Sequence, residues 1–172
     1  MTPLEFMSFR ARLEAASGFQ SDQFRQLEFT LGRKSPQAIA RFATGSRAHE
    51  ALERRFAEPT LWDAFLGYLA REGYAVPQSA LTREVTQPVQ PSEDLQQVLI
   101  EIYRQDPKNS EICERLVDLD EGIQEWRYRH VKMVERTIGV KMGTGGSAGA
   151  AYLRSTIGDP LFPDLWEIRS RL

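Results

Sequence analysis

The first residue whose type and setting could support chemistry is His130, which lies on the apolar stripe of a predicted long helix with Ile123, Trp126 and Met133. An imidazole facing an apolar interior must satisfy two ring nitrogens away from bulk water. It can do so by hydrogen bonds to both nitrogens, as an ordinary core histidine does, or by ligating a metal through one of them. A single histidine suits haem, because the macrocycle supplies four nitrogens and the protein only an axial one.

Other metal-binding or nucleophilic arrangements are not expected. The only further histidine, His49, lies among polar residues, and the chain has one cysteine, Cys113, so a zinc cluster rich in histidine or cysteine is not predicted. Cys113 precedes His130 by seventeen residues on the same predicted helix, which would hold the two side chains far apart. A single cysteine also excludes an internal disulfide framework.

Arg10 is the second candidate. It lies one turn after Phe6 and close to Leu13 on the predicted first helix. The planar guanidinium can donate two parallel hydrogen bonds to a carboxylate, which favours a ligand with an acid group. The alternative is an arginine that extends along the helix surface or forms an ion pair.

The third candidate is the glycine-rich stretch at residues 143–149, GTGGSAG. Its four glycines let backbone amides approach a ligand, and Thr144 and Ser147 add hydroxyl groups. No strand precedes it and no Lys-Ser/Thr pair ends it, so the phosphate-binding signature of a P-loop is not met. The alternative is a connector between two helices. The acidic residues Asp118, Asp120 and Glu121 are expected on the polar face of the long helix, as solvated charge.

Helices must position these residues, because apolar side chains recur at helical spacing and no convincing strand pattern occurs. Thr2 with Glu5, and Thr60 with Asp63, have the spacing of capping boxes, and Ser92 begins another helix. The predicted helices cover residues 2–17, 21–31, two short helices within 35–57, 60–72, 92–105 and 112–138, with a connecting loop at 74–91 and a closing segment at 150–172. The fold class is therefore all-α, a helical bundle in a single domain over residues 1–172.

The apolar stripes of these helices are expected to face the core. They comprise Phe24, Leu27 and Leu31 on the second helix, Leu61, Phe65, Leu66 and Leu69 on the helix at 60–72, and Ile112, Leu116, Leu119, Ile123, Trp126, His130 and Met133 on the long helix.

Charge and hydropathy exclude two classes of partner. With 22 basic and 24 acidic residues the net charge is −2, which argues against nucleic acid as the main partner. No stretch approaches the roughly 20 apolar residues of a membrane helix, and no signal peptide is visible. We therefore expect a cytoplasmic domain without a membrane partner.

The order of several strings resembles the tryptophan 2,3-dioxygenase family. The likeness extends over essentially the whole chain and is carried by ASGFQSDQFRQLEFTLG (residues 16–32), PTLWDAFLGYLAREGYAVP (59–77), WRYRHVKMVERTIGVKMGTGGSAGAAYLRS (126–155) and FPDLWEIRSRL (162–172). The resemblance implies the tryptophan/indoleamine dioxygenase fold and a haem b (iron) enzyme. Such an enzyme inserts dioxygen across the indole C2–C3 bond of L-tryptophan and gives N-formylkynurenine, the first step of tryptophan degradation by the kynurenine route.

The resemblance also implies roles for individual residues. The axial ligand of the haem iron is the histidine of the WRxRH motif, His130. The expected substrate-binding residues are Arg10 for the carboxylate, Thr144 for the polar end of the amino acid and Phe6 for the pocket wall, and Ser17 and Gly145 are expected at the cofactor. The family forms homotetramers, so a homo-oligomer is expected.

Family members carry additional N-terminal helices before the position that corresponds to Met1, and these helices complete the site. We therefore expect an N-terminally truncated form of the fold. The alternative to a dioxygenase is a catalytically incomplete haem- or tryptophan-binding helical protein, or a subunit, derived from this family.

Overall fold

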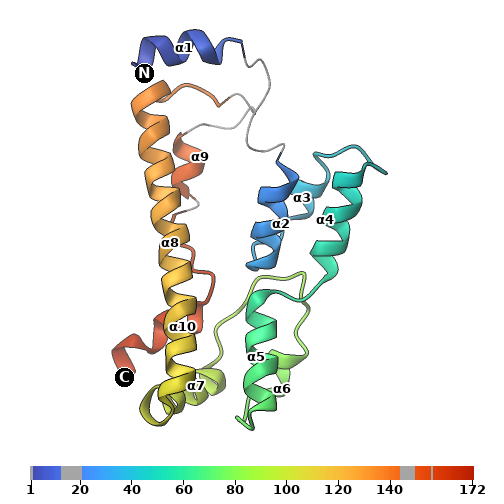
Figure 1. The fold of residues 1–172 in the computed structure, drawn as a ribbon, viewed down its shortest axis with the longest axis vertical. Coiled ribbons are helices and arrows are strands. Elements are labelled where there is room, and N and C mark those ends of the chain that lie inside the picture. Colours follow the sequence, from blue (N-terminus) through green and yellow to red (C-terminus); the bar gives the residue numbers. More distant parts are fainter. Residues whose placement is uncertain (1, 13–20, 144–149, 156) are drawn as a thin grey trace. The chain divides into compact units, whose positions relative to one another are not determined.

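Helices make up all the regular structure in the part of the chain that the computed structural model describes, which is residues 2–12, 21–143, 150–155 and 157–172 (Figure 1). The all-α prediction is confirmed. The elements are α1 (Pro3–Arg10), α2 (Asp22–Thr30), α3 (Pro36–Ile39), α4 (Arg47–Ala57), α5 (Leu61–Arg71), α6 (Gln78–Leu81), α7 (Glu93–Gln105), α8 (Pro107–Ile138), α9 (Ala150–Ser155), α10 (Pro163–Glu167) and the 3-10 helix η2 (Ile168–Arg171).

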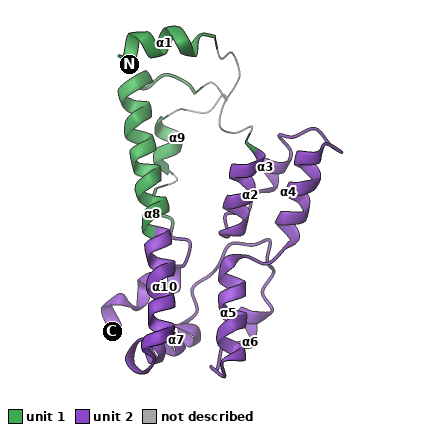
Figure 2. Ribbon diagram, viewed as in Figure 1, with its two compact units in different colours: residues 1–21, 121–159 green, residues 22–120, 160–172 purple. Residues whose placement is uncertain are grey.

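The chain divides into two compact units (Figure 2). Unit 1 comprises Met1–Ser21 and Glu121–Asp159, and unit 2 comprises Asp22–Asp120 and Pro160–Leu172. Each unit is thus built from two separate stretches of sequence. The single domain over residues 1–172 stays a prediction.

Three predicted helix starts are confirmed by their capping hydrogen bonds. The Glu5 amide donates to Thr2 Oγ1 (3.3 Å) and the Thr2 amide to Glu5 Oε2 (2.6 Å), which closes the first capping box. Thr60 and Asp63 form the second, and the Leu95 amide donates to Ser92 Oγ. These caps satisfy amide groups that a helix start leaves without a partner. The structure ends this helix at Arg10 with Ala11 as its C-cap, so its predicted continuation is wrong at Ala11 and Arg12, and residues 13–17 lie outside the described residues.

The contact of α2 with α4 forms one part of the unit 2 core. Phe29 and Leu52 are fully buried there, and the Phe29 and Phe56 rings meet edge to face with centroids 5.7 Å apart. The predicted inward face of α2 is wrong at Leu27, which is 48% exposed. The reason is that α4 covers the side of α2 that carries Phe29.

The core around α5 matches the predicted stripe at Phe65, Leu66 and Leu69, which are buried. Leu61 is only partly buried, and its neighbour Trp62 is buried instead. The Trp62 ring stacks on Phe162 with centroids 5.4 Å apart, because the C-terminal segment packs on that side of α5.

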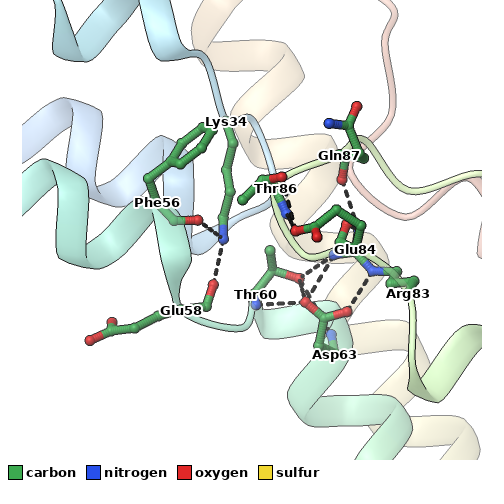
Figure 3. A network of polar contacts seen from close by, with 9 residues as sticks. All are labelled: Lys34, Phe56, Glu58, Thr60, Asp63, Arg83, Glu84, Thr86 and Gln87. Atoms are coloured by element: carbon green, nitrogen blue, oxygen red, sulfur yellow. Dashed lines mark hydrogen bonds and ion pairs between the residues drawn. The ribbon is translucent and has the colours of Figure 1, made fainter.

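The predicted loop at residues 74–91 contains the short helix α6, which sequence reasoning missed. The loop is attached to the N-terminus of α5 by Arg83, whose Nε and Nη2 donate to the two carboxylate oxygens of Asp63 at 2.5 and 2.9 Å (Figure 3). Burial alone would raise the pKa of Asp63, but hydrogen bonds from Arg83 and Thr60 outweigh it, so the pKa is lowered. The Asp63 carboxylate therefore stays charged and accepts hydrogen bonds at the N-terminus of α5.

Lys34 belongs to the same network (Figure 3). Its Nζ donates to the carbonyl oxygens of Phe56, at 2.7 Å, and Glu58. Burial lowers the pKa of Lys34. Because both carbonyls lie at the C-terminal end of α4, the lysine ties the segment after α2 to the turn between α4 and α5.

The long helix α8 begins at Pro107, before the predicted start at Ile112, and its predicted inward stripe is confirmed at Leu116, which is buried, but not at three other positions. Leu119, Trp126 and Met133 are 37%, 47% and 54% exposed. The buried positions are Cys113, Leu116, Val117, Asp120, Arg127 and Val131. Within unit 2 the C-terminal segment covers the side of α8 that carries Asp120, which explains the difference there.

Asp120 corrects the expectation of a solvated carboxylate. Its side chain is fully buried, and Oδ2 accepts hydrogen bonds from the backbone amides of Leu161 (2.8 Å) and Phe162 (3.3 Å) and from Trp166 Nε1 (2.8 Å). A buried carboxylate is stable only with such partners. Asp118 and Glu121 are exposed, as expected.

Candidate functional site

His130 is half-buried in the C-terminal part of α8, within unit 1. Its imidazole stacks on the Trp126 indole, with ring centroids 5.6 Å apart and planes inclined by 5°. Within the ranges that the structure describes, no hydrogen bond reaches either ring nitrogen of His130. The ring is stacked on the indole, and none of the described residues occupies its nitrogens.

Ion pairs brace the turns of α8 on both sides of His130. Arg129 Nη2 lies 2.6 Å from Glu125 Oε1, and Lys132 Nζ lies 3.0 Å from Glu135 Oε2. Glu135 also pairs with Arg154 of α9. Hydrogen bonds from Lys132 and Arg154 lower the pKa of Glu135, so this carboxylate stays charged and links α9 to α8.

Arg10 lies at the C-terminal end of α1 and donates from Nη2 to the carbonyl oxygen of Met142. This contact brings the end of α1 to the segment that enters the glycine-rich stretch. Met142 precedes Thr144 by two positions, and Thr144 and Gly145 themselves lie outside the described residues. Ser17 lies outside them as well.

Phe6 lies one helical turn before Arg10 and is half-buried. Its ring centroid is 6.4 Å from that of Phe9, with the planes inclined by 52°. No residue of α1 is fully buried. The structure thus places Phe6 and Arg10 on one short helix in the same unit as His130, and the predicted role of Phe6 in a pocket wall stays a prediction.

The donor set limits what metal chemistry is open to this chain. Among the described residues, no group of three or more His, Cys, Asp and Glu side chains could hold a metal ion. A metal at His130 would therefore have to bring most of its own ligands, as a haem does. The half-buried imidazole with open nitrogens fits that requirement.

Two further side chains of the types that bind metals or act as nucleophiles, Cys113 and His49, lie in unit 2. Burial raises the pKa of the fully buried Cys113 thiol to about 12, so it is a neutral side chain rather than a nucleophile. His49 lies on α4, where its Nδ1 is 3.3 Å from Glu53 Oε2.

Trp126 is the residue of this region to which sequence reasoning assigned no role. The available signal was its spacing, since side chains four positions apart on a helix share a face. Pattern alone placed it on an inward stripe, whereas it is half-exposed and covers the imidazole.

None of the described helices is both long and apolar enough to cross a membrane.

Comparison with known proteins gives a consistent picture. A family model described as tryptophan 2,3-dioxygenase matches residues 1–74 and 92–172. Proteins named tryptophan 2,3-dioxygenase are 61% identical in Herpetosiphon aurantiacus, 55% in Anaeromyxobacter sp. (strain K) and 43% in Myxococcus xanthus. Each alignment covers all of this chain but only 65%, 64% and 60% of the relative, respectively, so the chain spans somewhat less than two thirds of these relatives.

Proposed function

Because the chain belongs to the tryptophan 2,3-dioxygenase family, we propose that it acts in the oxidative cleavage of the indole C2–C3 bond of L-tryptophan by dioxygen, which gives N-formylkynurenine. The observation that carries this proposal is the family match, which includes the WRYRH and GTGGS strings. The relatives are longer than this chain, so the proposal concerns the activity to which these residues contribute.

We propose that His130 would hold the iron of a haem b. Three observations support the assignment: the ring is half-buried, no described residue donates to or accepts from its nitrogens, and no multidentate protein site competes among the described side chains. Haem, when bound, supplies the dioxygen chemistry. Ser17 and Gly145 are proposed to lie at the cofactor on the strength of their motifs alone.

We assign the substrate carboxylate to Arg10. The guanidinium now donates to a neutral carbonyl, that of Met142, and a carboxylate is a stronger acceptor for it. Thr144 is proposed to bind the polar end of the same amino acid on the strength of its motif, GTGGS. Phe6, one turn before Arg10, is proposed to line the indole side. Such positioning contributes a large part of the rate enhancement in enzymes.

A haemin titration of the chain tests the assignment of His130. We expect the unmodified chain to shift the Soret band of haemin on binding, and His130→Ala to abolish stable binding because the side chain that would hold the iron is lost. His49→Ala, which removes the other histidine, is the matched control and should bind haemin normally. Equal haemin affinity in His130→Ala and in the unmodified chain would reject the assignment.

Product formation then separates the two candidate functions. After reduction of the haem complex, addition of L-tryptophan and air should give the absorbance of N-formylkynurenine. A haem spectrum without product would instead support a haem- or tryptophan-binding protein that is catalytically incomplete. This alternative is specific because the chain covers only 60–65% of its relatives.

We also infer a homo-oligomer, which is a tetramer in the family. Large apolar side chains that are exposed on α1 and α8 support association, because exposed apolar surface favours contacts with other protein chains. They are Leu4, Phe9, Trp126 and Met133. Sedimentation velocity that shows only monomer at every concentration would contradict this inference.

A further inference from the structure

We propose that Trp126 is a positioning residue for His130: its indole fixes the orientation of the imidazole and so prepares the ring to ligate iron. The proposal rests on the proposed function, in which His130 holds the haem. It assigns a role to a side chain whose contacts with the imidazole are recorded in the structure and whose exposure leaves it little part in the core.

The geometry of the pair supports the proposal. Trp126 precedes His130 by four positions on α8, so the two side chains lie on one face of the helix. A centroid separation of 5.6 Å with planes inclined by 5° is that of an offset stacked pair. Stacking of this kind restrains rotation of the imidazole about its bond to Cβ.

That rotation matters because the terminal torsion of histidine is otherwise broad. In most histidine–metal sites the second ring nitrogen donates to a neighbouring group, and this hydrogen bond sets the ring orientation. Among the residues that the structure describes, none provides such a bond to His130. The stacked indole therefore supplies the restraint that a hydrogen bond supplies elsewhere, and a ring that is already oriented loses less entropy on ligation.

Comparison with Tyr128 shows that being an exposed aromatic residue on α8 does not by itself lead to a contact with the His130 ring. The two aromatic side chains lie on the same helix and are similarly exposed, at 47% and 51%. Tyr128 contacts the ammonium group of Lys132, with Nζ 5.7 Å from the ring centroid, and makes no ring contact with the imidazole. Tyr128 is therefore a matched control for an aromatic residue that does not touch His130.

The first test uses the haem-free chain and NMR of the imidazole carbon-bound protons. In the stacked pair these protons lie in the ring-current field of the indole. Trp126→Leu should shift the His130 signals and leave those of His49 in place, whereas Trp126→Phe should retain most of the ring-current effect. Tyr128→Leu should change neither histidine.

The second test is the haemin dissociation constant of the same variants. Trp126→Leu should weaken haemin binding roughly three- to ten-fold, the effect of losing one aromatic pair. Trp126→Phe should restore most of the affinity, and Tyr128→Leu should bind as the unmodified chain does. A change in general stability would affect the two leucine variants alike and would not be rescued by phenylalanine.

The outcomes separate this proposal from the one on which it rests. Unchanged His130 signals in Trp126→Leu would show that the stack does not exist in solution and would overturn the positioning role. Shifted signals with unchanged haemin affinity would overturn it too. If His130→Ala binds haemin normally, the haem assignment fails whatever Trp126 does; if only Trp126→Leu is silent, the positioning role alone fails.

Discussion

Arg10 donates from one of its guanidinium nitrogens to the carbonyl oxygen of Met142, and this contact shows that the guanidinium can reach the segment that precedes Thr144. Arg10→Leu should weaken tryptophan binding by about 2–5 kcal/mol, because a buried carboxylate would lose its charged partner. Haemin binding should not change.

Isothermal titration calorimetry of the haem-loaded chain measures the effect. Arg12→Leu is the matched control, since Arg12 is an exposed arginine just beyond the end of α1. Tryptophan affinity that is equal in Arg10→Leu and Arg12→Leu would remove Arg10 from the substrate site.

Asp120 and Asp118 lie two positions apart on α8 in opposite surroundings. Asp120→Ala leaves the amides of Leu161 and Phe162 and the indole N–H of Trp166 without their acceptor, so the free energy of unfolding should fall by about 2–4 kcal/mol. Asp118→Ala should change it by less than about 0.5 kcal/mol. Urea unfolding followed by circular dichroism at 222 nm compares the two, and equal midpoints would contradict the structural role of Asp120.

Asp106 supplies a prediction on pH. Hydrogen bonds from Tyr74 and then from Asn109 lower the pKa of Asp106 from 3.8 to about 2. Because the folded-state pKa is depressed, the stabilisation is complete above about pH 4 and is lost as the pH falls from about 4 to about 2. Tyr74→Phe removes the largest cause, so the pKa of Asp106 should rise toward 3.8 and the loss should begin at higher pH.

Carboxyl-carbon NMR titration of Asp106 in the two proteins measures this shift. Tyr128→Phe removes an exposed hydroxyl in the other unit and should leave the Asp106 titration unchanged. An Asp106 pKa that is the same in Tyr74→Phe and the unmodified chain would show that Tyr74 does not set it.

At the scale of helices, the starts marked by capping residues were predictable, whereas the buried faces were predictable for α5 but not for all of α2 and α8. A cap such as that of Thr60 with Asp63 depends on residues three positions apart, so the local sequence contains all of it. The burial of Leu27 or Trp126 depends on which other helix lies alongside, and periodicity does not contain that information. Asp120 is the clearest case, because its donors follow it in the chain by 41 to 46 positions.

The candidate site shows the same division. His130 and Arg10 could be singled out because an imidazole or guanidinium on an apolar stripe is unusual in itself. The glycine-rich stretch with Thr144 and Gly145 could be singled out by its composition, whereas Ser17 was assigned through the resemblance alone; all three stay predictions. The stacking of Trp126 on His130 could not be predicted, since it depends on the rotamers of two side chains and not on their spacing alone.

The two capping boxes allow a prediction about helix stability, because the same motif begins one helix with buried residues and one without. Thr60 is buried and begins α5, which carries core residues, whereas Thr2 is exposed and begins α1, which has none. Thr60→Ala should lower the free energy of unfolding by about 1–2 kcal/mol. Thr2→Ala should leave it unchanged in the same urea experiment, and Thr60→Ser should restore most of the loss. A Thr2→Ala variant that is as unstable as Thr60→Ala would contradict the prediction.

Over the whole molecule, buried apolar side chains are concentrated in unit 2. In the described part of unit 1 they are Val131 and Ala150, while unit 2 contains the cores around Phe29 and Trp62. Amide hydrogen exchange reports local opening, which is rarest where apolar contacts are densest. We therefore expect the slowest exchange in α5 and α7 and the fastest in α1.

Exchange followed by mass spectrometry on fragments covering these helices tests the expectation, with α5 as the internal reference. Haemin should slow exchange in the C-terminal part of α8 if His130 is its ligand, and should leave α5 unaffected. Equal protection of α1 and α5 in the haem-free chain would contradict the unequal distribution of the core.

The division of each unit into two stretches of sequence has a consequence for biosynthesis. A nascent chain that has left the ribosome only as far as Asp120 contains most of unit 2 but lacks the donors of Leu161, Phe162 and Trp166. Until residues 160–172 emerge, the carboxylate of Asp120 stays hydrated. The Trp62 ring likewise cannot stack on Phe162 before then. The intervening stretch, residues 121–159, belongs to the other unit. Because residues 160–172 are made after the stretch 121–159, the core of the larger unit can be completed only after that stretch of the smaller unit has been made.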